Sequence, residues 1–231
     1  MLTLAEWEAV GLSLRVAAVA VLITAPIGVA LAYLLARNRL PLSFVVENLV
    51  QLPLVLPPVV TGWVLLILLS PESVFGGWLE ATFGLRIAFG WFGAAVAAGI
   101  IAFPLMVQTM RVGFEQIDPS WEEAGYVYGG TRAAVFRHVT APLAGRAIAA
   151  GIVLAFARAL GEFGATIVLA GNIPSETRTL PLAIFTEIHR MGGELAVLRL
   201  VLVAILLSAA SLTVHALLRR RLPSRTDRPG T

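Results

Sequence analysis

The chain has 231 residues, of which 58% are hydrophobic and 13% are charged, and its net charge at pH 7 is +3. This composition excludes an ordinary soluble domain and predicts an all-α integral membrane protein, because a soluble chain of this length needs far more polar surface. The sequence contains no cysteine and no lysine, which excludes disulfides, thiolate metal sites, cysteine nucleophiles and a lysine-dependent Walker A loop. Any ATP that drives this protein is therefore expected to bind to another chain.

Five apolar blocks are long enough to cross a membrane as helices, since a hydrocarbon core of about 30 Å needs about 20 residues. They cover residues 12–36, 44–69, 90–113, 145–170 and 195–218. We therefore expect one transmembrane domain over 1–218, followed by a basic tail at 219–231.

The arginines indicate the orientation of these spans. Arg37 and Arg39 follow the first block, whereas Glu6 and Glu8 precede it, and most other arginines lie beside the 114–144 connection or in the tail. Because basic residues favour the cytoplasmic side, the N-terminus is expected outside and the C-terminus in the cytoplasm. The same pattern favours a retained first span over a cleaved signal peptide, and it does not form a nucleic-acid-binding face.

The second block contains three prolines within the stretch QLPLVLPPVVTG, residues 51–62. Proline removes backbone hydrogen bonds, so this span is expected to be kinked or broken. Irregular backbone at membrane depth needs protein or water around its carbonyl groups. A translocation path beside the break and a simple packing kink both remain open. The candidate path residues here are Pro57, Pro58 and Thr61.

The connection at 114–144 is unusually polar for so apolar a chain. Asp118 followed by Pro119 is typical of a helix start, and Gly129 is typical of a helix end. Thr131 can cap a second helix. These signals predict a two-helix hairpin on the cytoplasmic side.

The spacing of small and aromatic residues predicts one packing face on each helix of this hairpin. The first face consists of Trp121, Ala124, Gly125 and Tyr128, and the second of Val135, Phe136 and Val139. Pro142 then leads the chain back into the membrane.

Two opposite charges lie deep in the fourth apolar block. Arg158 and Glu162 are four residues apart in LAFARALGEFGATIVL, which places them on one face of the predicted helix. A lone charge at mid-bilayer costs about 2.5–3.5 kcal/mol, so the two side chains are expected to pair. A gating pair beside a translocation path and a salt bridge that only fixes helix packing remain equal alternatives.

The loop at 171–189 begins polar and then becomes amphipathic. It is too short and too charged to span the membrane, so we expect it to lie on the outer surface or to re-enter there. It is either the docking place of an extracytoplasmic partner or a solvated connector.

The hairpin is similar to the EAA loop of permease subunits of bacterial ABC importers. The resemblance is carried by Glu123-Ala124-Gly125, Gly129 and Val139-Thr140-Ala141-Pro142, with Gly125 and Ala141 replacing the alanine and leucine of the family pattern. In that family the loop seats a coupling helix in the ATPase subunit, whereas an ordinary solvated loop is the alternative. The resemblance assigns ATPase coupling to Glu122, Glu123, Ala124, Gly125, Tyr128, Gly129, Phe136, Val139 and Pro142.

Three further segments resemble the molybdate/tungstate branch of these permeases. QLPLVLPPVVTG and LAFARALGEFGATI are shared with sulfate/thiosulfate permeases, whereas GNIPSETRTLPLAI is closer to the molybdate members. The resemblance implies a permease for molybdate, with tungstate open and sulfate or thiosulfate as the alternative.

The same resemblance implies alternating access in a bacterial or archaeal cytoplasmic membrane. The expected partners are a second copy of the chain, two ATPase subunits, an oxyanion-binding protein and membrane lipid, with no nucleic acid. No catalytic site, cofactor or metal of its own is expected. A passive channel has no use for a coupling loop. An intramembrane enzyme is disfavoured because His138, His189 and His215 are isolated and no HExxH or GxSxG motif occurs.

Overall fold

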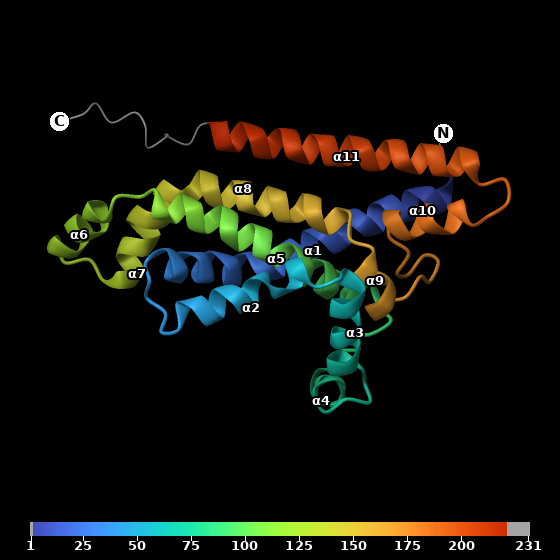
Figure 1. The fold of residues 1–231 in the computed structure, drawn as a ribbon, viewed down its shortest axis with the longest axis horizontal. Helices are drawn as coiled ribbons and strands as arrows, with labels where there is room; N and C mark the ends of the chain where they lie inside the picture. The colour runs from blue at the N-terminus through green and yellow to red at the C-terminus, as the bar shows by residue number, and fades with distance from the viewer. Residues whose placement is uncertain (1, 221–231) are drawn as a thin grey trace.

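The computed structural model describes residues 2–220, in which every regular element is a helix. The expected tail at 219–231 is described only for its first two residues, and residues 221–231 lie outside the described part. Figure 1 shows a long bundle with the hairpin of α6 and α7 at one end and the N-terminus and α10 at the other. We call these the hairpin end and the N-terminal end. The helices are α1 (Leu4–Ala36), α2 (Ser43–Val55), α3 (Pro58–Leu69), α4 (Val74–Phe83), α5 (Trp91–Glu115), α6 (Pro119–Val127), α7 (Arg132–Val135), the π-helix η1 (Phe136–Thr140), α8 (Ala141–Leu160), α9 (Gly164–Leu169), α10 (Leu180–Ile188) and α11 (Glu194–Arg220).

Four continuous helical segments within residues 2–220 are long and apolar enough to cross a membrane. They are α1, α5, the joined segment Arg132–Leu160, and α11 up to Leu218. The helix α1 starts eight residues before the expected position 12, because Thr3 and Glu6 form a capping box. The backbone N–H of Glu6 donates to Thr3 Oγ1 at 3.3 Å, and that of Thr3 donates to Glu6 Oε2 at 2.6 Å.

The expected second span is broken where the prolines predict it. The helix α2 ends at Val55, α3 begins at Pro58, and the two axes differ by 112°. Counted as one bent span, the pair gives a fifth candidate crossing. Because of the bend, α3 and α4 project away from the long bundle (Figure 1).

The expectation of one continuous helix over 145–170 is wrong. The helix α8 ends at Leu160, and the short α9 starts only at Gly164. The chain turns here because Glu162 lies beyond the end of α8, where its Oε1 accepts a hydrogen bond of 3.0 Å from the N–H of Ala165. The Glu162 side chain thereby satisfies one backbone N–H of the first turn of α9.

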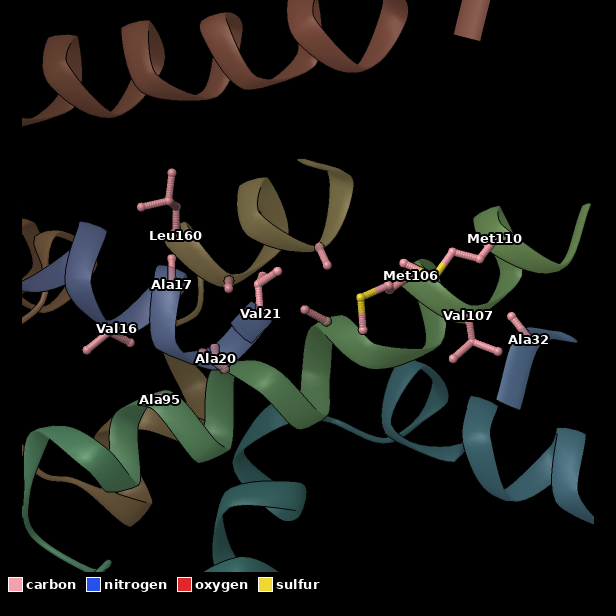
Figure 2. Packing of buried hydrophobic residues seen from close by; sticks show 14 of the residues in the cluster. Val16, Ala17, Ala20, Val21, Ala32, Ala95, Met106, Val107, Met110 and Leu160 are labelled. Atoms are coloured by element: carbon pink, nitrogen blue, oxygen red, sulfur yellow. The ribbon is translucent and has the colours of Figure 1, made fainter. Parts of the chain in front are cut away.

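The core lies where α1, α5 and α8 meet, and it is built largely from small side chains. Figure 2 shows alanine and valine side chains of α1 facing alanine and methionine side chains of α5. A Cβ added to Gly113 of α5 would stand 2.0 Å from the Cβ of Ala147 in α8. Small residues such as glycine and alanine let helix backbones approach closely, and membrane helices gain packing contacts in this way.

The helix α10 lies at the N-terminal end, and α11 starts there and runs along the bundle toward the hairpin end (Figure 1). Leu180, Leu182 and Ala183 are buried on α10, which lies against α1 and α11. The N–H of Leu180 donates to Ser13 Oγ of α1 at 2.6 Å. The helix α11 packs on α8 and α10 but leaves most of its apolar side chains exposed.

Candidate functional site

The helix α6 begins and ends as its sequence predicts. The Asp118 side chain caps the helix by accepting from the N–H of Ser120 at 3.0 Å, and Pro119 occupies the first turn. The helix ends at Val127, and Gly129 follows with a φ of +81°, a conformation that favours glycine. The result is a short helix that ends in a tight turn at Gly129.

The expected packing of Trp121, Ala124 and Tyr128 does not occur within the chain. The Trp121 side chain is 60% exposed, that of Tyr128 is 91% exposed, and Ala124 is exposed as well. Of that face only Gly125 packs, since a Cβ there would lie 2.9 Å from Val135 Cγ2. The helix instead turns Glu122 inward and leaves an exposed face of aromatic, apolar and acidic side chains. We call it the α6 face, and it consists of Trp121, Glu123, Ala124, Val127 and Tyr128.

The buried Glu122 side chain gathers donors from α1 and from η1. Arg37 reaches its Oε1 through both Nε (3.0 Å) and Nη2 (2.8 Å). Thr140 Oγ1 donates to the same oxygen at 3.1 Å. On Oε2, the Tyr33 hydroxyl donates at 3.4 Å and Arg39 Nη2 lies 3.5 Å away. We call these five residues the Glu122 cluster.

The two arginines of this cluster are fixed by further contacts. Arg37 also donates from Nη1 to the carbonyl of Ile117 at 3.3 Å, just before α6 begins. Arg39 donates from Nη1 to the Tyr33 hydroxyl at 2.8 Å. Nearby Tyr126 raises the pKa of the Arg39 guanidinium above its usual value, and Tyr33 and Glu122 add to this effect. Arg39 therefore keeps its positive charge beside Glu122.

The second half of the hairpin packs as predicted. Thr131 caps α7 by accepting from the N–H of Ala134 at 3.3 Å, and Val135 is buried. The Phe136 ring lies 4.8 Å, centroid to centroid, from the ring of Tyr33. Val139 is half-buried. Pro142 lies exposed in the first turn of α8.

The two breaks in the predicted spans lie against each other. A Cβ on Gly62 of α3 would stand 2.7 Å from the carbonyl oxygen of Ala165, and a Cβ on Gly164 would stand 2.9 Å from Cβ of Pro58. The backbones of α3 and α9 therefore touch without intervening side chains. Pro57 is exposed at the bend.

The predicted pair of Arg158 and Glu162 forms, with Nη1 of Arg158 2.8 Å from Oε2 of Glu162. The Glu162 side chain is 2% exposed, whereas that of Arg158 is 30% exposed. Glu162 therefore serves the turn between α8 and α9, and Arg158 reaches the surface of the chain. Thr61 is buried, and its hydroxyl has no hydrogen-bond partner among the described residues.

Sequence reasoning missed the partners of Glu122. Arg37 and Arg39 were interpreted only as orientation signals, although they bind a carboxylate that is 85 positions along the chain from Arg37. No local spacing rule links residues so far apart. The available signal was a pair of arginines directly after a span, together with a carboxylate in the first turn of a capped helix.

Comparison with known proteins gives consistent results. Residues 25–224 match the family model described as "Binding-protein-dependent transport system inner membrane component". The chain is 44% identical over 228 residues to the molybdenum transport system permease protein ModB of Escherichia coli K12, covering 99% of this chain and all of that protein. It is 37% identical over 177 residues to the sulfate transport system permease protein CysT of Salmonella typhimurium, covering 77% and 64%.

A crystal structure of a bacterial ABC transporter that imports alginate supports the fold. One chain of that transporter aligns with this chain at a TM-score of 0.72 and 19% sequence identity. The alignment covers 96% of this chain and 82% of the transporter chain. The family match covers most of the sequence, and the fold of the chain is consistent with that match. The chain therefore belongs to the family of binding-protein-dependent transport system inner membrane components, and is a multi-pass permease subunit of the cytoplasmic membrane.

Proposed function

We propose that this chain is the permease subunit of an ATP-driven importer of molybdate. The observation that carries the substrate is the 44% identity to the molybdenum permease of Escherichia coli over essentially the whole of both chains. The similarity to a sulfate permease is lower and covers 64% of that protein, so sulfate or thiosulfate is the second candidate. Tungstate is a tetrahedral oxyanion like molybdate, so it remains open as a further substrate.

The α6 face is the proposed contact with a separate ATPase subunit. This chain has no lysine for a Walker A loop, so the nucleotide must bind elsewhere. Tyr128 and Val127 are exposed at the tip of a short, capped helix, beside the exposed Glu123. Exposed aromatic side chains of this kind are common anchors at protein interfaces. Gly125 and Gly129 give the hairpin its compact shape.

A second copy of the chain is the proposed partner within the membrane. The bend at Pro57 and Pro58 leaves the carbonyls of Pro53 and Leu54 without the N–H donors that a continuous helix would supply. Lipid offers no hydrogen-bond donors, so these carbonyl groups need protein or a water-filled path beside them. A second copy of the chain is the protein that we propose there. We therefore place the path near Pro57, Thr61 and the partly exposed Arg158.

The proposed orientation rests on the distribution of charge. The Glu122 cluster lies at the hairpin end, which is the proposed cytoplasmic side, and α10 lies on the proposed outer side. The loop before α10 is held by a network in which Arg178 Nε donates to Asn172 Oδ1 at 2.9 Å. This ordered outer surface is the proposed dock for an oxyanion-binding protein.

The test is reconstitution of the chain in proteoliposomes with its cognate ATPase and binding protein. Uptake of labelled molybdate is measured with and without ATP, and with an excess of sulfate, tungstate or thiosulfate. ATP-dependent molybdate uptake that sulfate does not compete away is the expected result. Preferred uptake of sulfate would overturn the substrate assignment and leave the permease assignment intact.

The coupling surface is tested in the same preparation with Tyr128→Ala. Loss of ATPase co-purification is expected, because this exposed ring anchors the α6 face. The matched control is Trp78→Ala, which removes a half-exposed aromatic side chain from α4, away from the hairpin. Equal binding of the ATPase by both variants would argue against the coupling role.

A further inference from the structure

The strongest feature that the proposed function leaves unused is the Glu122 cluster. Glu122 and Glu123 are neighbours on α6, yet the first is buried and the second exposed. In the EAA-type assignment both carboxylates belong to the ATPase contact. The geometry gives Glu122 a different task, since its oxygens are occupied by donors of the same chain.

The cluster connects three segments at the hairpin end. Glu122 comes from α6, Arg37 and Tyr33 from the end of α1, and Thr140 from η1. Arg37 also binds the carbonyl of Ile117, so one guanidinium fixes both the first turn of α6 and the segment before it. An arginine that binds a buried carboxylate through two nitrogens gives a directional, rigid contact.

The link continues beyond α1. The residue after α1 is Arg37 itself, and the following loop leads into α2. In α2, Glu47 lies 2.8 Å from Arg111 of α5, which also binds Glu115 at 2.7 Å. Ion pairs thus join the end of α1 to α6 and, separately, α2 to α5, and the loop after α1 connects the two links. The far end of α2 is the bend at Pro57.

We propose that Glu122 is a positioning residue that fixes the coupling hairpin to α1, so that movement of the ATPase displaces α1 and α2 together with α6. This inference rests on the proposed function, since it needs an ATPase at the α6 face. Without the contact, α6 would remain attached to the bundle through its chain connections to α5 and α7 and through its packing on α7 and η1. ATP hydrolysis would then continue with less movement of the transmembrane helices.

The first test compares two adjacent isosteric changes, Glu122→Gln and Glu123→Gln, in the proteoliposomes. Glu122→Gln keeps an acceptor for Arg37 but removes the charge, and Arg37→Gln attacks the same contact from α1. Glu122→Gln and Arg37→Gln are each expected to bind the ATPase. Each is expected to lower the molybdate uptake per ATP hydrolysed by roughly fivefold or more, which is the lower end of site-to-site coupling effects. Glu123→Gln is expected to weaken ATPase binding and to leave the uptake per ATP of assembled complexes unchanged.

The second test separates rigid attachment from a merely structural role. The chain has no cysteine, so spin labels can be placed at Ala30→Cys in α1 and Ser120→Cys in α6 without other changes. The distance distribution between the labels is measured with and without trapped ATP. With Glu122 intact it is expected to be narrow and identical in both states, and with Glu122→Gln to broaden or to depend on nucleotide.

Two outcomes would overturn the proposal. One is a label distance that changes with nucleotide in the unmodified cluster, and the other is unchanged uptake per ATP in Glu122→Gln. Failure of the proposed function is recognised separately, because the unmodified chain would then neither bind the ATPase nor take up molybdate. The nucleotide-free label distances of the chain alone would still report whether Glu122 holds α6 on α1.

Discussion

The Glu6 carboxylate in the first turn of α1 binds Arg199 of α11, with Nη2 of Arg199 2.6 Å from Oε1 and its Nε 3.2 Å from the same oxygen. These residues are 193 positions apart, and the contact joins the first turn of α1 to the beginning of α11. The helix α11 exposes most of its apolar side chains, and Leu200 is among the few that are buried. The ion pair therefore supplies an orienting contact for a helix with little packing of its own.

Glu6→Ala is expected to lower the melting temperature of the purified protein in detergent by several degrees. The change leaves Arg199 without its carboxylate and removes half of the capping box at the start of α1. The matched control is Glu80→Ala, which removes the partner of Arg86 from a pair whose arginine side chain is 73% exposed. Such exposed pairs contribute little. Equal shifts for both variants would contradict the orienting role of Glu6.

Gly62→Ala is expected to destabilise the protein by about 1–3 kcal/mol, the usual cost of overpacking. The new methyl group would meet the Ala165 backbone, which cannot move aside as a flexible side chain can. Gly11→Ala is the control, because its Cβ would have no neighbour within 4 Å, and alanine is favoured over glycine in a helix by about 1 kcal/mol. Thermal unfolding measures both, and a Gly62→Ala variant as stable as the control would show that α3 and α9 can separate freely.

The comparison of sequence and structure shows which features are locally determined. The caps of Asp118 and Thr131, the exit at Gly129 and the break at the paired prolines follow from backbone chemistry within a few residues, so the sequence predicts them. The interruption after Leu160 was not predicted, because the apolar pattern continues through it. Only the tertiary structure reveals that Glu162 accepts a hydrogen bond from the first turn of a new helix there.

The direction in which α6 faces is a second feature that local pattern did not determine. Aromatic and small residues at helical spacing usually mark the buried side, so Trp121 and Tyr128 were expected inside. They lie outside, and the side of α6 that faces the bundle carries Glu122, which contacts Arg37, Tyr33 and Thr140. The partners of this carboxylate are distant in sequence, so the local spacing of residues does not predict its burial.

The double variant Arg158→Leu with Glu162→Gln separates the two open roles of this pair. Glu162→Ala alone is expected to cost up to about 3 kcal/mol, the low end for a buried pair, since the Arg158 side chain is 30% exposed. In the double variant no charge is left unpaired, and the introduced amide retains an oxygen for the N–H of Ala165, so the melting temperature is expected to recover.

Molybdate uptake by this double variant is expected to stay low, because the partly exposed guanidinium of Arg158 is the group assigned to the path. Full recovery of both stability and uptake would show that the pair serves packing only. Arg158→Lys with Glu162 intact is the charge-conserving control, and it is expected to retain more uptake than the double variant.

The orientation of the chain can be tested directly, because no native cysteine competes for a thiol reagent. Met191 lies fully exposed beyond α10, and the Val127 side chain is 85% exposed at the opposite, hairpin end. Met191→Cys and Val127→Cys therefore report on the two sides of the membrane. A membrane-impermeant maleimide is expected to label Met191→Cys in spheroplasts and to label Val127→Cys only in inverted vesicles. The arginine distribution predicts this result, since Arg37 and Arg39 share the side of Val127. The opposite labelling pattern would place the α6 face outside the cell, where no ATPase could bind it, and would refute the coupling assignment together with the orientation.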